Sequence, residues 1–201
     1  MEAFESFVAL TMEADTEDGR LVVSESIKFS VTRQTAKTAH TETQTHGFEV
    51  DLVGARRDKL VLATVKSFFG SRGVVAEHVM RESATKRFNA LYAMINDPVV
   101  RDAVVQGAAN RYGYPIDQIE LRLYVGKFAG GKTGDHERRI RDWAATQIVG
   151  AGPIRVFGLK DIVATARQVA SSKTYRDNPA LVAMKVMEAA GVLAPTSNHL
   201  G

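Results

Sequence analysis

The sequence predicts an α/β protein with a mixed central sheet flanked by helices and followed by a C-terminal helical extension. Two observations lead to this fold class. Segments with the two-residue alternation of strands lie between segments with the period of helices, in the order helix, three strands, helix and strand. The composition, 45% hydrophobic and 24% charged, is that of a globular chain long enough to bury a core.

The first elements lie in residues 1–46. Residues 2–14 carry apolar side chains at helical spacing, so we expect an amphipathic helix there, followed by an acidic break that ends in glycine. Residues 21–33 alternate as a strand. Residues 35–46 are rich in threonine and short of large apolar side chains, which predicts a loop or an exposed extension.

Residues 47–66 predict a β-hairpin. Two apolar runs, Phe48–Val53 and Leu60–Val65, flank a charged turn. Because side chains alternate across a strand, this hairpin can bring Asp51 and Lys66 close together on one surface of the sheet. A carboxylate and an ammonium group are costly to bury there without a partner or a purpose. We therefore expect either a functional site or an ordinary hairpin whose charges pair with each other.

The rest of the chain continues with helices and short strands. A turn with two glycines precedes a helix expected at residues 74–95. We divide the chain into an α/β domain, residues 1–158, and a C-terminal helical extension, residues 159–201. The extension could be a winged-helix-like or helix-turn-helix unit, but we favour a simple helical cap because its last helix has few basic residues for reading a DNA groove. Further helices are predicted at 99–112, 135–149, 159–170 and 180–190, and strands at 119–125 and 154–157.

The hairpin resembles the core of the PD-(D/E)XK nuclease superfamily, which has the restriction-endonuclease-like fold. In that family an Asp closes one strand, an acidic residue and a Lys two positions later lie on the next, and together they bind a divalent metal ion and cut phosphodiester bonds. Asp51, in Glu-Val-Asp-Leu-Val, matches the first position and Lys66, in Thr-Val-Lys, the last. The sequence departs at Thr64, where the family usually has Glu, Asp or Gln.

The resemblance implies a metal-dependent DNA endonuclease that uses Mg²⁺ or Mn²⁺. In some members of the family the acidic residue has moved to the following helix, and Glu77 is the candidate for that role here, with Glu49 as a further metal ligand. Thr64 also fits a protein that kept the fold and binds nucleic acid or a protein partner without cutting it. The resemblance further implies a homodimer, because cleavage of both DNA strands often needs two active sites.

Residues 126–133 satisfy the phosphate-binding pattern G-x-x-x-x-G-K-[ST] and follow a predicted strand. A working P-loop needs its Lys and Thr to open a helix, whereas another glycine follows here and Asp135 is the expected N-cap. A nucleotide-binding protein remains an alternative, but we expect a flexible basic loop. The candidate nucleic-acid contacts are Arg72, Lys127 and Lys132.

Charge and composition set the remaining expectations. The net charge of +3 and the pI near 9.2 permit nucleic-acid binding. The absence of cysteine excludes disulfides, a thiol nucleophile and a thiolate zinc site, and it suits a cytoplasmic protein. The sequence has no apolar run long enough to span a bilayer and no leader pattern, so no membrane partner is expected.

Overall fold

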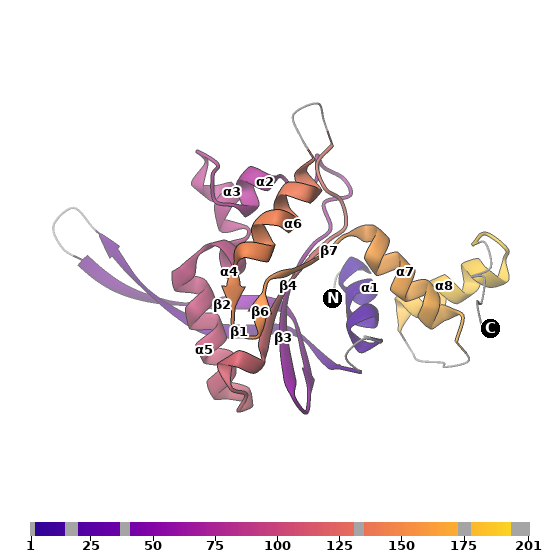
Figure 1. The fold of residues 1–201 in the computed structure, drawn as a ribbon, viewed down its shortest axis with the longest axis horizontal. Helices are drawn as coiled ribbons and strands as arrows, with labels where there is room; N and C mark the ends of the chain where they lie inside the picture. The colour runs from indigo at the N-terminus through magenta and orange to yellow at the C-terminus, as the bar shows by residue number, and fades with distance from the viewer. Residues whose placement is uncertain (1–2, 15–19, 37–40, 131–134, 173–177, 194–201) are drawn as a thin grey trace.

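The structure is a computed structural model that describes residues 3–14, 20–36, 41–130, 135–172 and 178–193. Within these residues, a mixed sheet of five strands in the order β1-β2-β3-β4-β7 forms the centre, with helices on both faces (Figure 1). The predicted α/β class is confirmed, and so is the order of the five sheet strands and the long helices. None of the helices in the described ranges is both long and apolar enough to cross a membrane.

The first three strands are antiparallel, and β4 and β7 then run parallel to β3. The predicted hairpin is confirmed, with Leu52 opposite Ala63. The strands are β1 (Val22–Ala36), β2 (Thr41–Arg56), β3 (Lys59–Lys66), β4 (Ile119–Val125) and β7 (Arg155–Phe157), and β5 (Ile148–Val149) and β6 (Gly152–Pro153) form a separate small ribbon.

Most of the long helices agree with the prediction because their ends are marked in the sequence. Asp97 accepts a hydrogen bond from the N–H of Val99 and precedes a proline, and Asn178 caps the last helix in the same way. Asp135 is the N-cap that the sequence predicts. These helices are α1 (Ala3–Glu13), α5 (Pro98–Tyr112), α6 (His136–Thr146), α7 (Leu159–Ala170) and α8 (Pro179–Ala189).

The single helix predicted at residues 74–95 is wrong. This segment, all of which is described, instead contains short helices separated by turns. The physical reason lies at Arg81, whose φ of 63° is left-handed and cannot occur inside a right-handed helix. The short helices are α2 (Ala76–Val79), α3 (Lys86–Ala90) and α4 (Ala93–Asn96), and a 3₁₀ turn, η1 (Ile116–Gln118), follows α5.

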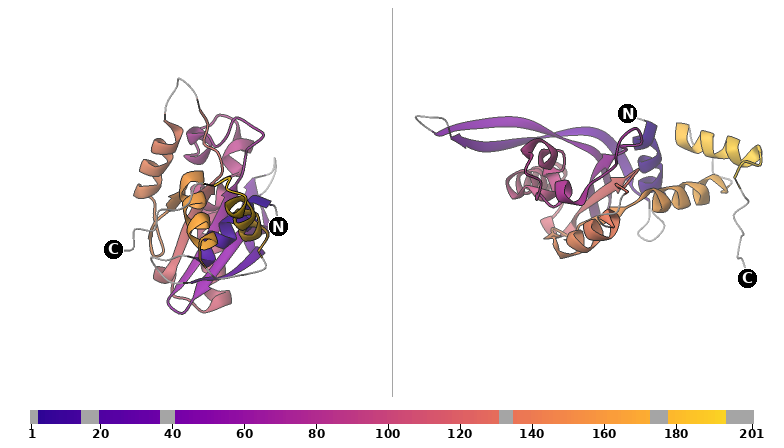
Figure 2. Two further views of the ribbon diagram at one scale, coloured as in Figure 1. Left: turned by 90° about the vertical axis from the view of Figure 1, so that its right-hand side faces the viewer. Right: turned by 90° about the horizontal axis from the view of Figure 1, so that it is seen from above.

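Of the two structures predicted for residues 35–46, a loop or an exposed extension, the described part is an extension made of paired strands. Strands β1 and β2 continue through residues 36 and 41 as a two-stranded arm that projects from the body (Figure 2). Backbone pairing holds this arm, and Thr32 and Thr45 add a cross-strand hydrogen bond of 2.9 Å. Threonine favours strands although it is polar, so the shortage of large apolar residues does not imply a loop.

The two faces of the sheet pack against different helices. On β3, Leu60 and Leu62 face a core shared with α4, α5 and α6, whereas Val61, Ala63 and Val65 face α1 and α7. Helices α7 and α8 also pack against α1 through a third apolar cluster that includes Leu10 and Leu181. Helices α1 and α7 therefore cover one face of the sheet, and α8 packs against these two helices farther from the strands (Figure 1).

Candidate functional site

Strand β2 parts from β3 at Asp51. Backbone pairing between the two strands ends at Leu52 and Ala63, while β2 continues with β1 into the arm. On β1, Ser26 has a left-handed φ of 51° and interrupts the pairing opposite Asp51. The alternation of β2 breaks at the same place, because Val50 and Val53 join one core while Leu52 joins the other. Asp51 thus lies in a fork between two strands.

The fork brings Asp51 and Lys66 together, as the hairpin predicts. The Oδ2 atom of Asp51 lies 3.5 Å from the Lys66 ammonium, and the two side chains are 22% and 19% exposed. The same oxygen accepts hydrogen bonds from the N–H of Val65 at 2.6 Å and from the hydroxyl of Thr64 at 3.0 Å. The Asp51 side chain therefore replaces the backbone pairing between β2 and β3 at this point. Hydrogen bonds from Thr64 and Val65 of β3 fix the position of its carboxylate.

The other predicted metal ligands lie against cations. Glu77 of α2 forms an ion pair with Arg139 of α6 at 2.5 Å, and Glu49 lies 3.8 Å from Lys28 on the neighbouring strand. Buried His136 also joins α2 to α6, since its Nδ1 accepts a hydrogen bond from the N–H of Ala76. In the described ranges, no three His, Cys, Asp or Glu side chains form a group able to hold a metal ion. The predicted ligands Asp51, Glu77 and Glu49 therefore do not form one metal site.

The ion pair gives Glu77 a pH-dependent contribution to stability. The hydrogen bond from Arg139 holds the pKa of Glu77 below its usual value, so its contribution is present above the unfolded-state pKa and is lost as the pH falls through the folded-state pKa. Because the carboxylate is 39% exposed, we expect Glu77→Gln to lower the melting temperature at neutral pH by only about 2 °C.

Melting curves of the wild type and Glu77→Gln from pH 7 down to pH 3 test this expectation. The difference between the two proteins should shrink below the ordinary pKa of a glutamate, about 4.3, and then disappear. The exposed pair of Lys28 and Glu49 offers a control, since Glu49→Gln should change the melting temperature less. A difference for Glu77→Gln that does not shrink at all between pH 5 and pH 3 would contradict the ion pair as its cause.

Two loops lie side by side beyond the carboxyl ends of the parallel strands β3 and β4. The N–H of Gly126 donates to the carbonyl of Lys66, and the Lys127 ammonium donates to the carbonyl of Ser71 at 2.7 Å. Gly73 has a φ of 102°, and a Cβ there would meet the backbone of Phe128, so this close approach requires glycine. The loops thus bring the segments that carry Arg72 and Lys127 to the edge where Lys66 ends β3.

The phosphate-binding pattern is only partly described. Lys132 and Thr133 lie outside the described residues, and the nucleotide-binding alternative stays a prediction. Helix α6 begins at His136 and is capped by Asp135, which accepts a hydrogen bond from the N–H of Arg138 at 3.0 Å. Helix α6 therefore begins after the end of the pattern.

A buried charged network, which the sequence does not predict, lies on the other face of the sheet. Glu120 and Arg122 of β4 are 7% and 2% exposed, and the Arg122 Nε donates to the Glu120 carboxylate. Glu120 also lies 3.3 Å from Lys59 and 3.7 Å from Arg155. The only sequence signal is the alternation of apolar and polar residues in β4, Ile-Glu-Leu-Arg-Leu-Tyr-Val. A strand whose polar side chains face solvent has the same alternation.

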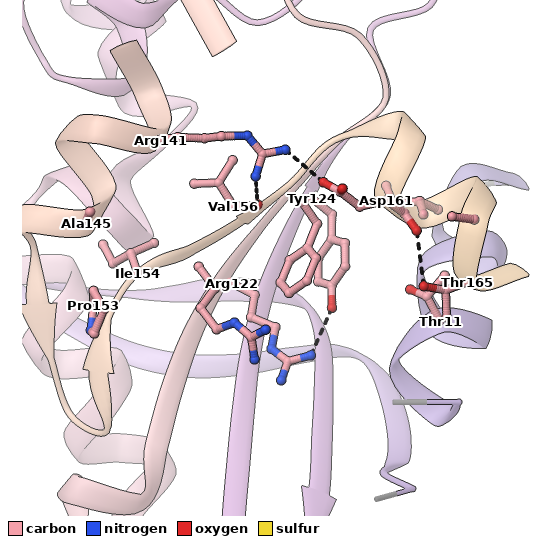
Figure 3. A pocket seen from close by; sticks show the side chains of 14 residues that line it. Thr11, Arg122, Tyr124, Arg141, Ala145, Pro153, Ile154, Val156, Asp161 and Thr165 are labelled. Atoms are coloured by element: carbon pink, nitrogen blue, oxygen red, sulfur yellow. Dashed lines mark hydrogen bonds and ion pairs between the residues drawn. The ribbon is translucent and has the colours of Figure 1, made fainter. Parts of the chain in front are cut away.

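A cavity of about 620 Å³ opens beside this network, between β4, β7, α6 and α7 (Figure 3). Arg122, Arg141 and Arg155 line it together with apolar side chains and one carboxylate, that of Asp161. Tyr124 and Phe157 are stacked with their ring centroids 4.8 Å apart, and both line the cavity.

Comparison of the chain with models of known protein families finds no match, and neither do comparisons with curated proteins and with solved structures.

Proposed function

We propose that this chain is a metal-dependent DNA endonuclease-like protein that hydrolyses phosphodiester bonds at the fork between β2 and β3. The supporting observation is the contact of 3.5 Å between Asp51 and Lys66, which places a carboxylate beside an ammonium group at the end of a sheet strand. Hydrolysis of a phosphodiester needs a metal-held water and a positive charge near the scissile phosphate. These two residues supply a metal ligand and such a charge.

Within the described residues, the fork offers only one carboxylate, so Asp51 would hold a metal ion there only together with oxygens of the substrate phosphate. Mg²⁺ is commonly bound by one or two carboxylates together with substrate phosphates, and Asp51 offers one carboxylate. Lys66 is placed to orient the attacking water or to stabilise charge on the phosphate. The loops that carry Arg72 and Lys127 lie at the same edge of the sheet, which is where ligands bind in open α/β sheets. They are suited to contact the DNA backbone.

The experiment is incubation of supercoiled plasmid with the wild-type protein and Mg²⁺ or Mn²⁺, with a metal titration by calorimetry in parallel. We expect nicking that requires the metal and stops when a chelator is added.

The second candidate function is nucleic-acid binding without cleavage. It is favoured by the hydroxyl of Thr64, which donates to Asp51 where the resembled family has a second carboxylate. Plasmid that is shifted on a gel but never cut with either metal would support this second function and contradict the first.

Thr64→Glu tests whether the fork is a metal site. Thr64 is 6% exposed and contacts Asp51, so a glutamate there places two carboxylates together in a nearly buried position. Without metal, we expect a loss of stability of about 1–3 kcal/mol from like-charge repulsion and burial. A divalent ion relieves this repulsion, so Mn²⁺ should restore the melting temperature and increase plasmid cleavage by about tenfold.

Thr64→Gln is the matched control, because it has the size of glutamate without its charge. Mn²⁺ should raise the melting temperature of Thr64→Glu by several degrees and leave that of Thr64→Gln nearly unchanged. Equal responses of the two variants to Mn²⁺ would show that Asp51 does not lie in a metal site.

A further inference from the structure

The cavity beside Arg122 is separate from the fork that carries Asp51. In the β3–β4 register Arg122 is next to Ala63 and Tyr124 is next to Val65, and these β3 side chains face α1 and α7. Thr64 and Lys66 alternate with them and face the opposite side of the sheet. A ligand in the cavity therefore does not compete with a substrate at the fork.

Two guanidinium groups lie side by side in the wall of the cavity. Arg122 of β4 and Arg155 of β7 are direct partners in the parallel register, and both side chains line the cavity. Like charges at adjacent positions on neighbouring strands destabilise a sheet, so this arrangement has an energetic cost. The carboxylate of Glu120 contacts both groups and holds them together.

The guanidinium of Arg122 is fixed by its surroundings. Its Nη1 donates to the hydroxyl of Tyr124 at 3.2 Å, and the group lies over the ring of Phe157 with a distance of 5.3 Å to the centroid. Arg155 lies over the same ring at 5.1 Å, and its side chain is 35% exposed. Because packing already holds both groups in place, an anion that binds them does not have to order flexible side chains.

The rest of the cavity wall is also held in place. Arg141 of α6 donates to the carbonyl of Val156 at 2.6 Å and to the carboxylate of Asp161 at 2.8 Å, and it thereby joins α6 to β7 and α7 (Figure 3). Ile154, Val156 and Ile162 supply apolar surface. A few fixed polar groups among apolar side chains, around a volume of about 620 Å³, are the usual features of a small-molecule site.

We propose that this cavity binds a small anionic molecule, with its phosphate or carboxylate group against Arg122 and Arg155 and its body against the apolar wall. The planar guanidinium group is suited to both kinds of oxyanion, because it presents paired N–H donors that match two oxygens of one group. This site does not depend on the function proposed for the fork, and its test does not involve DNA or a divalent metal.

The test is a calorimetric and thermal-shift titration with inorganic phosphate, adenosine monophosphate and citrate, each up to about 10 mM in a background of constant ionic strength. We expect at least one of these anions to bind the wild type with a Kd of about 1 mM or tighter and to raise its melting temperature. Binding of phosphate or adenosine monophosphate alone identifies a phosphate site, and binding of citrate alone identifies a carboxylate site.

The variant is Arg155→Gln, which removes one of the paired guanidinium groups from a half-buried position, and the control is Arg138→Gln on the exposed surface of α6. Arg155→Gln should weaken the binding by about tenfold or more, whereas Arg138→Gln should leave it unchanged. Failure of all three anions to bind the wild type overturns the proposal. Equal binding by the wild type and Arg155→Gln also overturns it, because the anion then binds elsewhere.

Discussion

We expect Asp51→Asn to abolish the proposed metal-dependent cleavage of plasmid DNA and to leave the fold intact. The asparagine amide oxygen can still accept hydrogen bonds from the N–H of Val65 and the hydroxyl of Thr64, which hold the fork together. The substitution removes the negative charge that we propose as the metal ligand. Because a metal ion contributes several kcal/mol of charge stabilisation to hydrolysis, we expect the rate of nicking to fall by at least about 100-fold.

Asp51→Ala separates the chemical role of the carboxylate from its structural role. Alanine removes the acceptor for the Val65 N–H and the negative partner of Lys66, so the free energy of unfolding should fall by about 2–4 kcal/mol. Asp51→Asn should lose clearly less, as urea unfolding of both variants will show. Wild-type nicking by Asp51→Asn would mean that Asp51 only joins the two strands, and the proposed active site would be wrong.

Glu120→Gln destabilises the protein by about 3–5 kcal/mol, the cost of removing one charge from a buried ion pair. The Glu120 carboxylate contacts Arg122, which is 2% exposed, and also Lys59 and Arg155. Glutamine has nearly the same shape, so the loss measures the charge and not a cavity. The measurement is the midpoint of urea unfolding at neutral pH.

Glu137→Gln is the control for this expectation. Glu137 also pairs with an arginine, Arg141, but the two side chains are 45% and 37% exposed. Solvent screens such a pair, so this substitution should cost less than about 1 kcal/mol. If Glu120→Gln costs no more than Glu137→Gln, burial of the network does not decide its contribution to stability.

The parts of this protein that the sequence predicts correctly depend on interactions between residues near one another in the chain. The caps of α5, α6 and α8 depend on one Asp or Asn and the next few N–H groups. The contact between Asp51 and Lys66 depends on a hairpin whose tight turn sets the register. Alternation and turn length are enough to place such residues on one surface.

Elsewhere, contacts between segments that are distant in the chain decide the outcome. Glu77 matches a metal ligand by its place in the sequence, yet Arg139, from a helix much later in the chain, pairs with its carboxylate. The helix predicted at residues 74–95 is broken into short pieces, whose apolar residues join the core beneath α5 and α6. The threonine-rich segment becomes an arm because β1 supplies its partner strand.

By itself, the sequence therefore determined the order of the sheet strands and long helices, most of the ends of those helices, and the contact of Asp51 with Lys66. Periodicity, capping and a short hairpin are local, and this is why they can be predicted. Only the tertiary structure decided which acidic residues pair with which arginines and that Arg122 lines a cavity. An alternating strand has the same pattern whether its polar face meets water or a covering helix. The packing of α1 and α7 over the sheet is what distinguishes the two.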